Sequence, residues 1–148
     1  MKNFDCIIVG AGVVGLAVAK DLAIDGHSVL LIERHDSFGK ETSSRNSEVI
    51  HGGMYYPTGS LKATLCVEGR RLLYDFCSSY KILFKKTGKI IVATDREEIP
   101  ALEKLFQLGN ANGVEGLCII TKKEIKSLQP YVSGVAALYS PETGIIDS

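Results

Sequence analysis

Short runs of apolar residues alternate with polar, glycine-containing segments along this chain, and their spacing predicts the secondary structure. Near the N-terminus, residues 5–9, which are apolar from Cys6 onward, predict a buried strand. Residues 10–15 form a glycine turn that opens a helix continuing to Ile24. A second apolar run, residues 27–33, predicts a strand parallel to the first. The pattern therefore indicates a β-α-β unit at the start of the chain.

A long helix is predicted over residues 60–79, with Ser60 as its N-cap. Large apolar residues recur along it at spacings of three, four and seven and predict the face that packs in the core, namely Leu61, Leu65, Leu72, Phe76 and Tyr80. The charged residues off this stripe are Glu68, Arg70, Arg71 and Asp75. We therefore expect a core-packing helix rather than a cofactor-binding element.

The second half of the chain is predicted to be richer in strands. The expected elements are strands 82–84, 88–94, 117–120 and 134–140, helices 96–111 and 121–129, and the beginning of a further element at 144–148. Asp95 is the expected N-cap of the first of these helices, and Thr121 with Glu124 predicts a capping box. The fold class is therefore α/β, with a nucleotide-binding part over residues 1–80 and the start of a β-rich (α+β) part over residues 81–148, neither of them complete.

Three glycines follow the first predicted strand in the pattern G-x-G-x-x-G: Gly10, Gly12 and Gly15. In this setting the first glycine permits a tight turn, the second lets the backbone approach a pyrophosphate, and the third lets the helix pack against the strand. The helix N-terminus, at Val13 and Val14, presents N–H groups and the positive end of the helix dipole to the phosphates. The alternative is a glycine-rich turn in an α/β protein that binds no nucleotide.

An acidic residue, Glu33, ends the second predicted strand about 20 residues after the glycines, at the position of the ribose-binding acid in this pattern. A carboxylate at this point can accept hydrogen bonds from the ribose hydroxyls of an adenosine, and it disfavours a 2′-phosphate. The sequence therefore favours FAD or NAD over NADP. The alternative for Glu33 is a solvated charge at the end of a strand.

The polar segment 34–47 has a length that is typical of functional loops, although a flexible surface loop is the alternative. Groups suited to a phosphate and a polyol chain are supplied by Ser43, Ser44, Arg45 and Asn46. Downstream, His51 stands directly before Gly52-Gly53, a pair that permits close backbone approach to a flat or bulky group. An imidazole titrates near neutral pH and is suited to general-base catalysis, whereas a structural histidine is the alternative.

Composition narrows the classes of function. The 148 residues are 45% hydrophobic, which is enough for a domain with a core. The 17 basic and 17 acidic residues give no net charge and no basic stripe, so we expect no nucleic-acid partner. The four cysteines show no C-x-x-C spacing, so we expect no metal site. Neither a signal peptide nor a membrane span is predicted, and we expect a cytoplasmic protein or one bound peripherally at the inner membrane.

Residues 43–57, 59–63 and 66–74 closely resemble the L-2-hydroxyglutarate oxidases/dehydrogenases, which belong to the FAD-dependent oxidoreductases of the D-amino-acid-oxidase type. The resemblance covers essentially the whole chain and is most specific over residues 43–74. It implies a Rossmann-like unit that binds FAD, followed by a substrate domain. Members run well over twice this length and have a discontinuous FAD domain, so we expect these residues to lack the returning flavin-binding segment and most of the substrate pocket.

The resemblance also implies roles for individual residues. The glycine turn would bind the pyrophosphate and Glu33 the adenosine ribose, with Arg34 beside the adenine. The residues implied to follow the pyrophosphate, the ribityl chain and the flavin ring are Thr42, Ser43, Ser44, Arg45, Asn46, Ser47, His51, Gly52 and Gly53. His51 is the candidate catalytic base, and Arg45 or Lys62 is the candidate cation for a dicarboxylate substrate.

The reaction that the resemblance implies is oxidation of L-2-hydroxyglutarate, a small 2-hydroxy dicarboxylate, to 2-oxoglutarate. A hydride leaves C2 for flavin N5 while a base takes the hydroxyl proton, and the electrons pass to oxygen or to a membrane quinone. One alternative is another member of the same superfamily, of the glycerol-3-phosphate dehydrogenase or amino-acid oxidase type. The other is an inactive dinucleotide-binding fragment.

Overall fold

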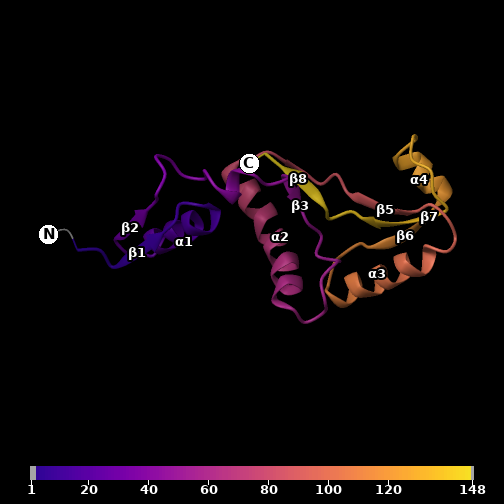
Figure 1. Ribbon diagram of the computed structural model, residues 1–148, viewed down its shortest axis with the longest axis horizontal. Coiled ribbons are helices and arrows are strands. Elements are labelled where there is room, and N and C mark those ends of the chain that lie inside the picture. The colour runs from indigo at the N-terminus through magenta and orange to yellow at the C-terminus, as the bar shows by residue number, and fades with distance from the viewer. Residues whose placement is uncertain (1–2, 148) are drawn as a thin grey trace. The chain divides into compact units, whose positions relative to one another are not determined.

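The computed structural model describes residues 3–147 and has a mixed α/β fold, as predicted (Figure 1). The chain divides into two compact units, one reaching to Ser47 and the other comprising Glu48–Asp147. This division lies earlier in the chain than the predicted boundary after residue 80. A compact unit is not in itself a functional domain, so the assignment of 1–80 to cofactor and 81–148 to substrate stays a prediction.

The first unit is the predicted β-α-β arrangement. Its elements are β1 (Cys6–Val9), α1 (Val13–Ile24) and β2 (Val29–Ile32), followed by the short 3-10 helix η1 (Thr42–Ser44). The two strands are parallel, with Cys6 opposite Val29 and Val9 opposite Ile32. Helix α1 ends at the predicted place, because Gly26 adopts a φ of +89° that glycine tolerates best.

The second unit contains two antiparallel sheets, ordered β3-β8-β4 and β5-β7-β6. Its elements are β3 (Val49–Ile50), α2 (Leu61–Tyr80), β4 (Phe84–Lys85), β5 (Lys89–Ala93), α3 (Ile99–Ala111), β6 (Cys118–Thr121), α4 (Lys122–Leu128), β7 (Ala136–Ser140) and β8 (Gly144–Ile146). The predicted strand 88–94 is present in shortened form as β5, whereas the predicted strand 82–84 is displaced to Phe84–Lys85 as β4, and the two strands belong to different sheets.

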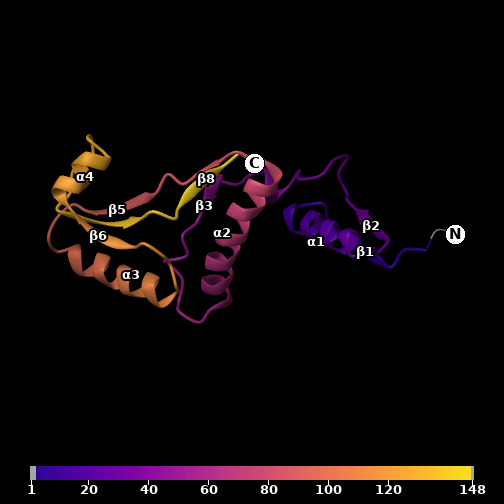
Figure 2. The ribbon, with the colours of Figure 1, turned by 180° about the vertical axis from the view of Figure 1, so that it is seen from behind.

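The β5-β7-β6 sheet is covered on both faces, by α3 on one side and by α4 on the other (Figures 1 and 2). Alternate strand residues separate these two layers, as the pleat of a sheet requires. Leu102 of α3 belongs to the same buried cluster as Leu138 of β7, whereas Ile125 of α4 packs with Ala137 of β7. These two apolar layers, one on each face of the sheet, form the core of the second unit.

The predicted capping box is confirmed at α4, where the Thr121 hydroxyl accepts the Glu124 N–H and the Glu124 carboxylate accepts the Thr121 N–H. Asp95 was expected to cap the helix before it. Its carboxylate instead accepts the N–H groups of Glu97 and Glu98 in a turn, and α3 starts later, at Ile99. The helix 60–79 is confirmed as α2, with the Ser60 hydroxyl accepting the Ala63 N–H.

The predicted packing face of α2 is wrong in this structure. Leu61, Leu65 and Leu72 are 78%, 60% and 67% exposed. The buried residues lie on a different stripe, also at spacings of three and four: Ala63, Val67, Arg70, Tyr74 and Cys77. The prediction selected the most hydrophobic stripe, and a stripe that contains the charged Arg70 does not stand out by hydrophobicity. Arg70 can be buried because it has polar partners, and these partners are distant in sequence.

Candidate functional site

The glycine turn is built as the motif predicts. Gly10 has a φ of +103°, in the left-handed region that favours glycine, and its N–H donates to the Ile32 carbonyl over 2.7 Å. A Cβ on Gly15 would lie well under 3.0 Å from the carbonyl oxygen of Gly10, so only glycine fits there without moving the backbone. Gly10 thus connects the turn to β2 by a hydrogen bond, and Gly15 allows α1 to pack closely against the turn.

Glu33 reaches back to this turn from the end of β2. One carboxylate oxygen accepts the N–H of Ala11 over 2.7 Å, and the other accepts the N–H groups of Arg34 and His35 over 2.8 and 3.0 Å. The backbone N–H of Ala11, followed by that of His35, holds the pKa of Glu33 below its usual range. The carboxylate is therefore ionised at neutral pH and lies beside the glycines, as the motif requires.

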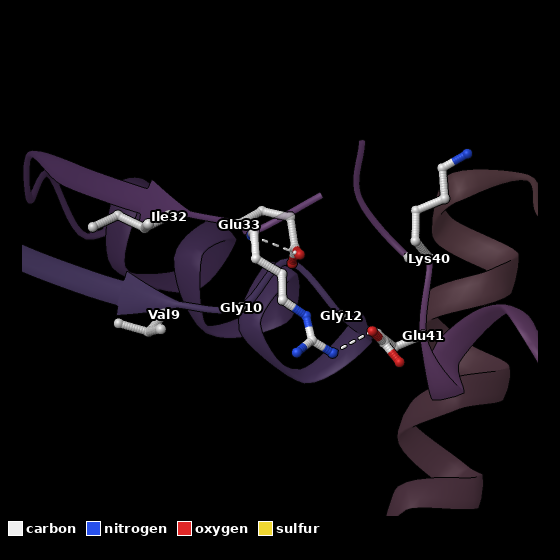
Figure 3. Close-up of a pocket in the computed structure, with 9 residues that line it drawn as sticks. Val9, Gly10, Gly12, Ile32, Glu33, Lys40 and Glu41 are labelled. Atoms are coloured by element: carbon white, nitrogen blue, oxygen red, sulfur yellow. Dashed lines mark hydrogen bonds and ion pairs between the residues drawn. The ribbon is translucent and has the colours of Figure 1, made fainter. Parts of the chain in front are cut away.

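An open groove of about 430 Å³ lies along this turn (Figure 3). Its lining residues are Val9, Gly10, Gly12, Ile32, Glu33, Arg34, Gly39, Lys40 and Glu41. All of them belong to the first unit, and they come from the carboxyl ends of the two strands and the loop after β2. Small-molecule sites have volumes of about 300–1,000 Å³ and lie at such strand ends in open α/β sheets.

The N-terminus of α1 is only partly satisfied by the protein itself. The Val13 N–H donates to the Ser43 hydroxyl over 2.9 Å. Within the described part of the chain, the N–H groups of Gly12 and Val14 donate no hydrogen bond. These groups, the helix dipole and the two constrained glycines fit the pyrophosphate of an adenine dinucleotide.

The loop after β2 contributes a cluster of charged side chains to the lining of the groove. The Arg34 guanidinium pairs with the Glu41 carboxylate, and the His35 ring lies 2.7 Å from the same carboxylate oxygen. Hydrogen bonds from His35 and then from Arg34 lower the pKa of Glu41. Arg34 therefore lines the groove, as the implied adenine contact requires, but its charge is already partnered.

The remaining loop residues predicted to bind the cofactor lie in η1 or directly after it and are mostly exposed. Ser44 and Asn46 use their side chains on the loop itself, donating to the carbonyls of Glu41 and Ser43 over 3.0 and 2.8 Å. The Ser43 hydroxyl accepts a hydrogen bond from the Val13 N–H of the glycine turn. Thr42, Arg45 and Ser47 are exposed, and contact of these residues with a cofactor stays a prediction.

The other predicted site residues belong to the second unit. His51 is exposed and directly follows β3, and its carbonyl accepts the Cys66 thiol over 3.7 Å. A Cβ on Gly52 would meet the Ser140 hydroxyl at 3.0 Å, while one on Gly53, whose φ is +97°, would overlap Val67. Internal packing therefore accounts for both glycines. The Lys62 ammonium lies 4.5 Å from the centre of the Tyr56 ring, a cation–π contact that leaves its N–H donors available.

Sequence reasoning missed five residues of the groove: Val9, Ile32, Gly39, Lys40 and Glu41. For Gly39 the sequence did offer a signal, namely a glycine within the polar loop after β2. In the structure this glycine has a φ of +69° and donates its N–H to the Ala11 carbonyl over 2.9 Å.

Between Asn3 and Asp147, no helix is long and apolar enough to cross a membrane. Over the same residues, no cluster of three metal-binding side chains occurs.

A parallel β-α-β unit with a glycine turn, an acid at the end of β2 and a groove between them defines the class of proteins built to hold an adenine dinucleotide. The family described as "DAO: FAD dependent oxidoreductase" matches residues 5–148, and the chain belongs to this family. The family assignment and the α/β fold agree with the sequence-based predictions.

Individual relatives agree with this assignment. Over 99% of its length the chain is 53% identical to the mitochondrial L-2-hydroxyglutarate dehydrogenase of Arabidopsis thaliana and 44% identical to that of Homo sapiens. It spans only 30% and 32% of those two proteins. Among solved structures, the FAD-bound L-α-glycerophosphate oxidase of Mycoplasma pneumoniae matches 99% of this chain and 40% of its own, with a TM-score of 0.87 and 34% identity.

Proposed function

We propose that this chain supplies the part of an FAD-dependent L-2-hydroxyglutarate dehydrogenase or oxidase that binds the adenosine diphosphate portion of FAD. The observation that carries the proposal is the 53% identity over 99% of the chain to a relative of that name. The preformed turn supports it, because the Gly15 and Glu33 geometry suits a dinucleotide without rearrangement. FAD, when bound, supplies the acceptor for a hydride from C2 of the substrate.

The residues of the first unit have the task of holding the cofactor. The N–H groups of Gly12 and Val14 donate to the pyrophosphate, and the Glu33 carboxylate accepts from the adenosine ribose. Ser43 already satisfies the Val13 N–H, so its hydroxyl keeps the polar loop against the N-terminus of α1. The exposed residues Thr42 and Ser47 are available to the rest of the cofactor.

The candidate residues for handling the substrate are His51 and either Lys62 or Arg45. The His51 ring makes no hydrogen bond within residues 3–147, so it is available to take the proton of the substrate hydroxyl. The candidate cation for a substrate carboxylate is Lys62 or Arg45, whose charged groups have no carboxylate partner in the described residues. Electrons leave to oxygen or a quinone, and the protein is cytoplasmic or peripheral at a membrane.

The test is anaerobic reduction of the flavin in the purified protein by L-2-hydroxyglutarate, followed through the visible absorption of oxidised flavin. We expect bleaching by this substrate in preference to its D-enantiomer, glycerol 3-phosphate and amino acids. His51→Asn should slow bleaching by a factor of about 10² to 10⁴. The matched control is His27→Asn, at an exposed histidine between α1 and β2. A protein that binds no flavin contradicts the proposal, and faster bleaching by the D-enantiomer or an amino acid contradicts the choice of L-2-hydroxyglutarate as substrate.

One observation favours a second candidate. The glycerophosphate oxidase is 34% identical over 99% of this chain, which makes glycerol 3-phosphate the alternative substrate in the bleaching assay. Both substrates carry an anion beside a secondary alcohol, and both would use a base and a cation in the same way. Faster bleaching by glycerol 3-phosphate than by L-2-hydroxyglutarate would decide for this alternative.

A further inference from the structure

The segment Gly52–Tyr56, directly after the candidate base His51, has no regular secondary structure, and its first three residues are buried. Gly52, Gly53 and Met54 are buried, and Met54 is fully enclosed in the core of the second unit. Backbone carbonyls in such a segment have no strand or helix partners, so they need other donors. Two of them, at Gly53 and Tyr56, receive these hydrogen bonds from one side chain.

That side chain is Asn112, at the C-terminal end of α3 and more than fifty residues away in sequence. Its amide nitrogen donates to the Tyr56 carbonyl over 2.8 Å and to the Gly53 carbonyl over 3.3 Å. The backbone around Asn112 is itself fixed, since its N–H donates to the Leu108 carbonyl and the Val114 N–H donates to Gly109. Helix α3 packs on the sheet core, so Asn112 projects from a rigid support.

The amide has one favourable orientation at this position. Its oxygen is buried and accepts no hydrogen bond within the described residues. Rotating the amide by 180° would bring that oxygen against two carbonyl oxygens and lose both hydrogen bonds. The buried oxygen without a partner is unfavourable, so the favourable contribution of this side chain comes from its two N–H donors. Aspartate has the same shape and lacks them.

The segment that Asn112 holds adjoins both candidate substrate groups, His51 along the chain and Lys62 through the Tyr56 ring. His51 lies between β3, which is paired with β8, and the turn whose carbonyls Asn112 binds. Tyr56, at the other end, places its ring under the Lys62 ammonium. Fixing the backbone from Gly53 to Tyr56 therefore restricts both the candidate base and the candidate cation.

We propose that Asn112 is a positioning residue that fixes the Gly53–Tyr56 backbone and thereby sets the placement of His51 and Lys62. The catalytic part of this statement rests on the proposed function. The structural part does not, because it concerns contacts within the second unit.

The experiment compares Asn112→Asp with Asn110→Asp, an identical change at an exposed asparagine of the same helix. Hydrogen exchange is measured on the purified protein, in peptides covering residues 52–57. We expect exchange at least about tenfold faster in N112D at pH 8, because a carboxylate then faces two carbonyls. Exchange in N110D should match the native protein.

The pH dependence gives a signature that a general loss of packing lacks. A carboxylic acid at position 112 regains one O–H donor when it protonates, and the surrounding carbonyls favour that neutral form. The excess exchange of N112D, corrected for the intrinsic rate, should therefore shrink between pH 8 and pH 5. Asn112→Ala should show the same excess at both pH values. Should N112D fail to fold, Asn112→Ser keeps one donor and should give an intermediate rate.

Activity provides the last readout, and it separates the two proposals. For N112D, kcat with L-2-hydroxyglutarate should fall at least about tenfold at pH 8, with recovery toward pH 5 relative to the native profile. Native exchange at residues 52–57 in N112D overturns the positioning role, as does an equal rise throughout β5, β7 and α3. Faster local exchange with unchanged kcat overturns its catalytic part. A native protein that does not oxidise L-2-hydroxyglutarate contradicts only the proposed function, since the exchange result still decides the contact.

Discussion

The two units place their candidate site residues by different means. In the first unit, backbone hydrogen bonds, a glycine contact and one carboxylate make the turn, and Ala11 is the only apolar residue of the described part that is buried there. In the second unit, His51 lies between β3, which pairs with β8, and Met54, which is buried in an apolar cluster with residues of β7 and α3. Local backbone geometry therefore positions the site residues of the first unit, and side-chain contacts between distant parts of the chain position those of the second.

Arg70 illustrates the second case. Its side chain is 1% exposed and donates to Glu142 over 2.9 Å while pairing with Glu115. The neighbouring Tyr74 hydroxyl donates to the Glu142 carbonyl over 2.8 Å. These contacts join α2 to two turns that lie about 45 and 70 residues further along the chain. We therefore expect substitutions that alter the backbone to have the largest effect in the first unit. In the second unit, truncation of buried side chains should have the largest effect.

The largest effect is expected from Gly15→Ala. The added methyl group would overlap the Gly10 carbonyl, so the turn and α1 must separate. We expect unfolding to become easier by about 3 kcal/mol and FAD affinity to fall at least about 100-fold, equivalent to roughly 2.7 kcal/mol. Flavin titration and chemical denaturation measure the two quantities.

The matched control is Gly69→Ala in α2, where an added Cβ meets nothing within 4 Å. This variant should be about 0.5–1 kcal/mol more stable than the native protein, because alanine favours a helix over glycine. Equal behaviour of the two variants would contradict the claim that the first unit depends on its backbone geometry.

Arg70→Met should have the next largest effect. Removing the guanidinium leaves two carboxylates without their buried partner, but both retain some exposure to water, so we expect a loss of about 2–3 kcal/mol. Arg71→Met removes an exposed arginine from the same Glu115 and should cost less than about 1 kcal/mol. Denaturation curves measure both, and a larger loss for Arg71→Met would reverse our ranking of the two contacts.

A smaller effect is expected from Glu33→Gln. The amide keeps the shape of the side chain but replaces one acceptor with a donor, so it cannot accept the Ala11, Arg34 and His35 N–H groups together. We expect FAD affinity to fall about tenfold, equivalent to about 1.4 kcal/mol. Asp21→Asn, at an exposed residue of α1, should leave it unchanged. An unaltered affinity in Glu33→Gln would remove Glu33 from the cofactor site.

The smallest effect concerns pH. Burial raises the pKa of Glu115, but hydrogen bonds from Arg70, its own backbone and Arg71 outweigh burial and leave the pKa below its usual range. A depressed folded-state pKa stabilises the fold above the unfolded pKa of about 4.3 and loses that contribution as the pH falls further. Stability should therefore decline below about pH 4.3 in the native protein and more gently in Arg70→Met. Parallel pH profiles of the two proteins would contradict this assignment.

The same comparison explains which features could be predicted from sequence. The glycine turn, Glu33, the Ser60 cap and the Thr121 capping box were all predictable, because each depends on residues within one element or at the ends of paired strands. The buried face of α2 and the role of Asn112 were not. Arg70 and Asn112 are polar residues whose partners lie more than forty residues away, and no local pattern identifies those partners.

The central claim is that the glycine turn of the first unit holds the adenosine diphosphate portion of FAD. Hydrogen exchange of the purified protein with and without FAD tests it directly, resolved to the amides of Gly12 and Val14. We predict slower exchange at these amides when FAD binds, with no change in α4. Unchanged exchange at Gly12 and Val14 in protein that visibly retains flavin would contradict the account.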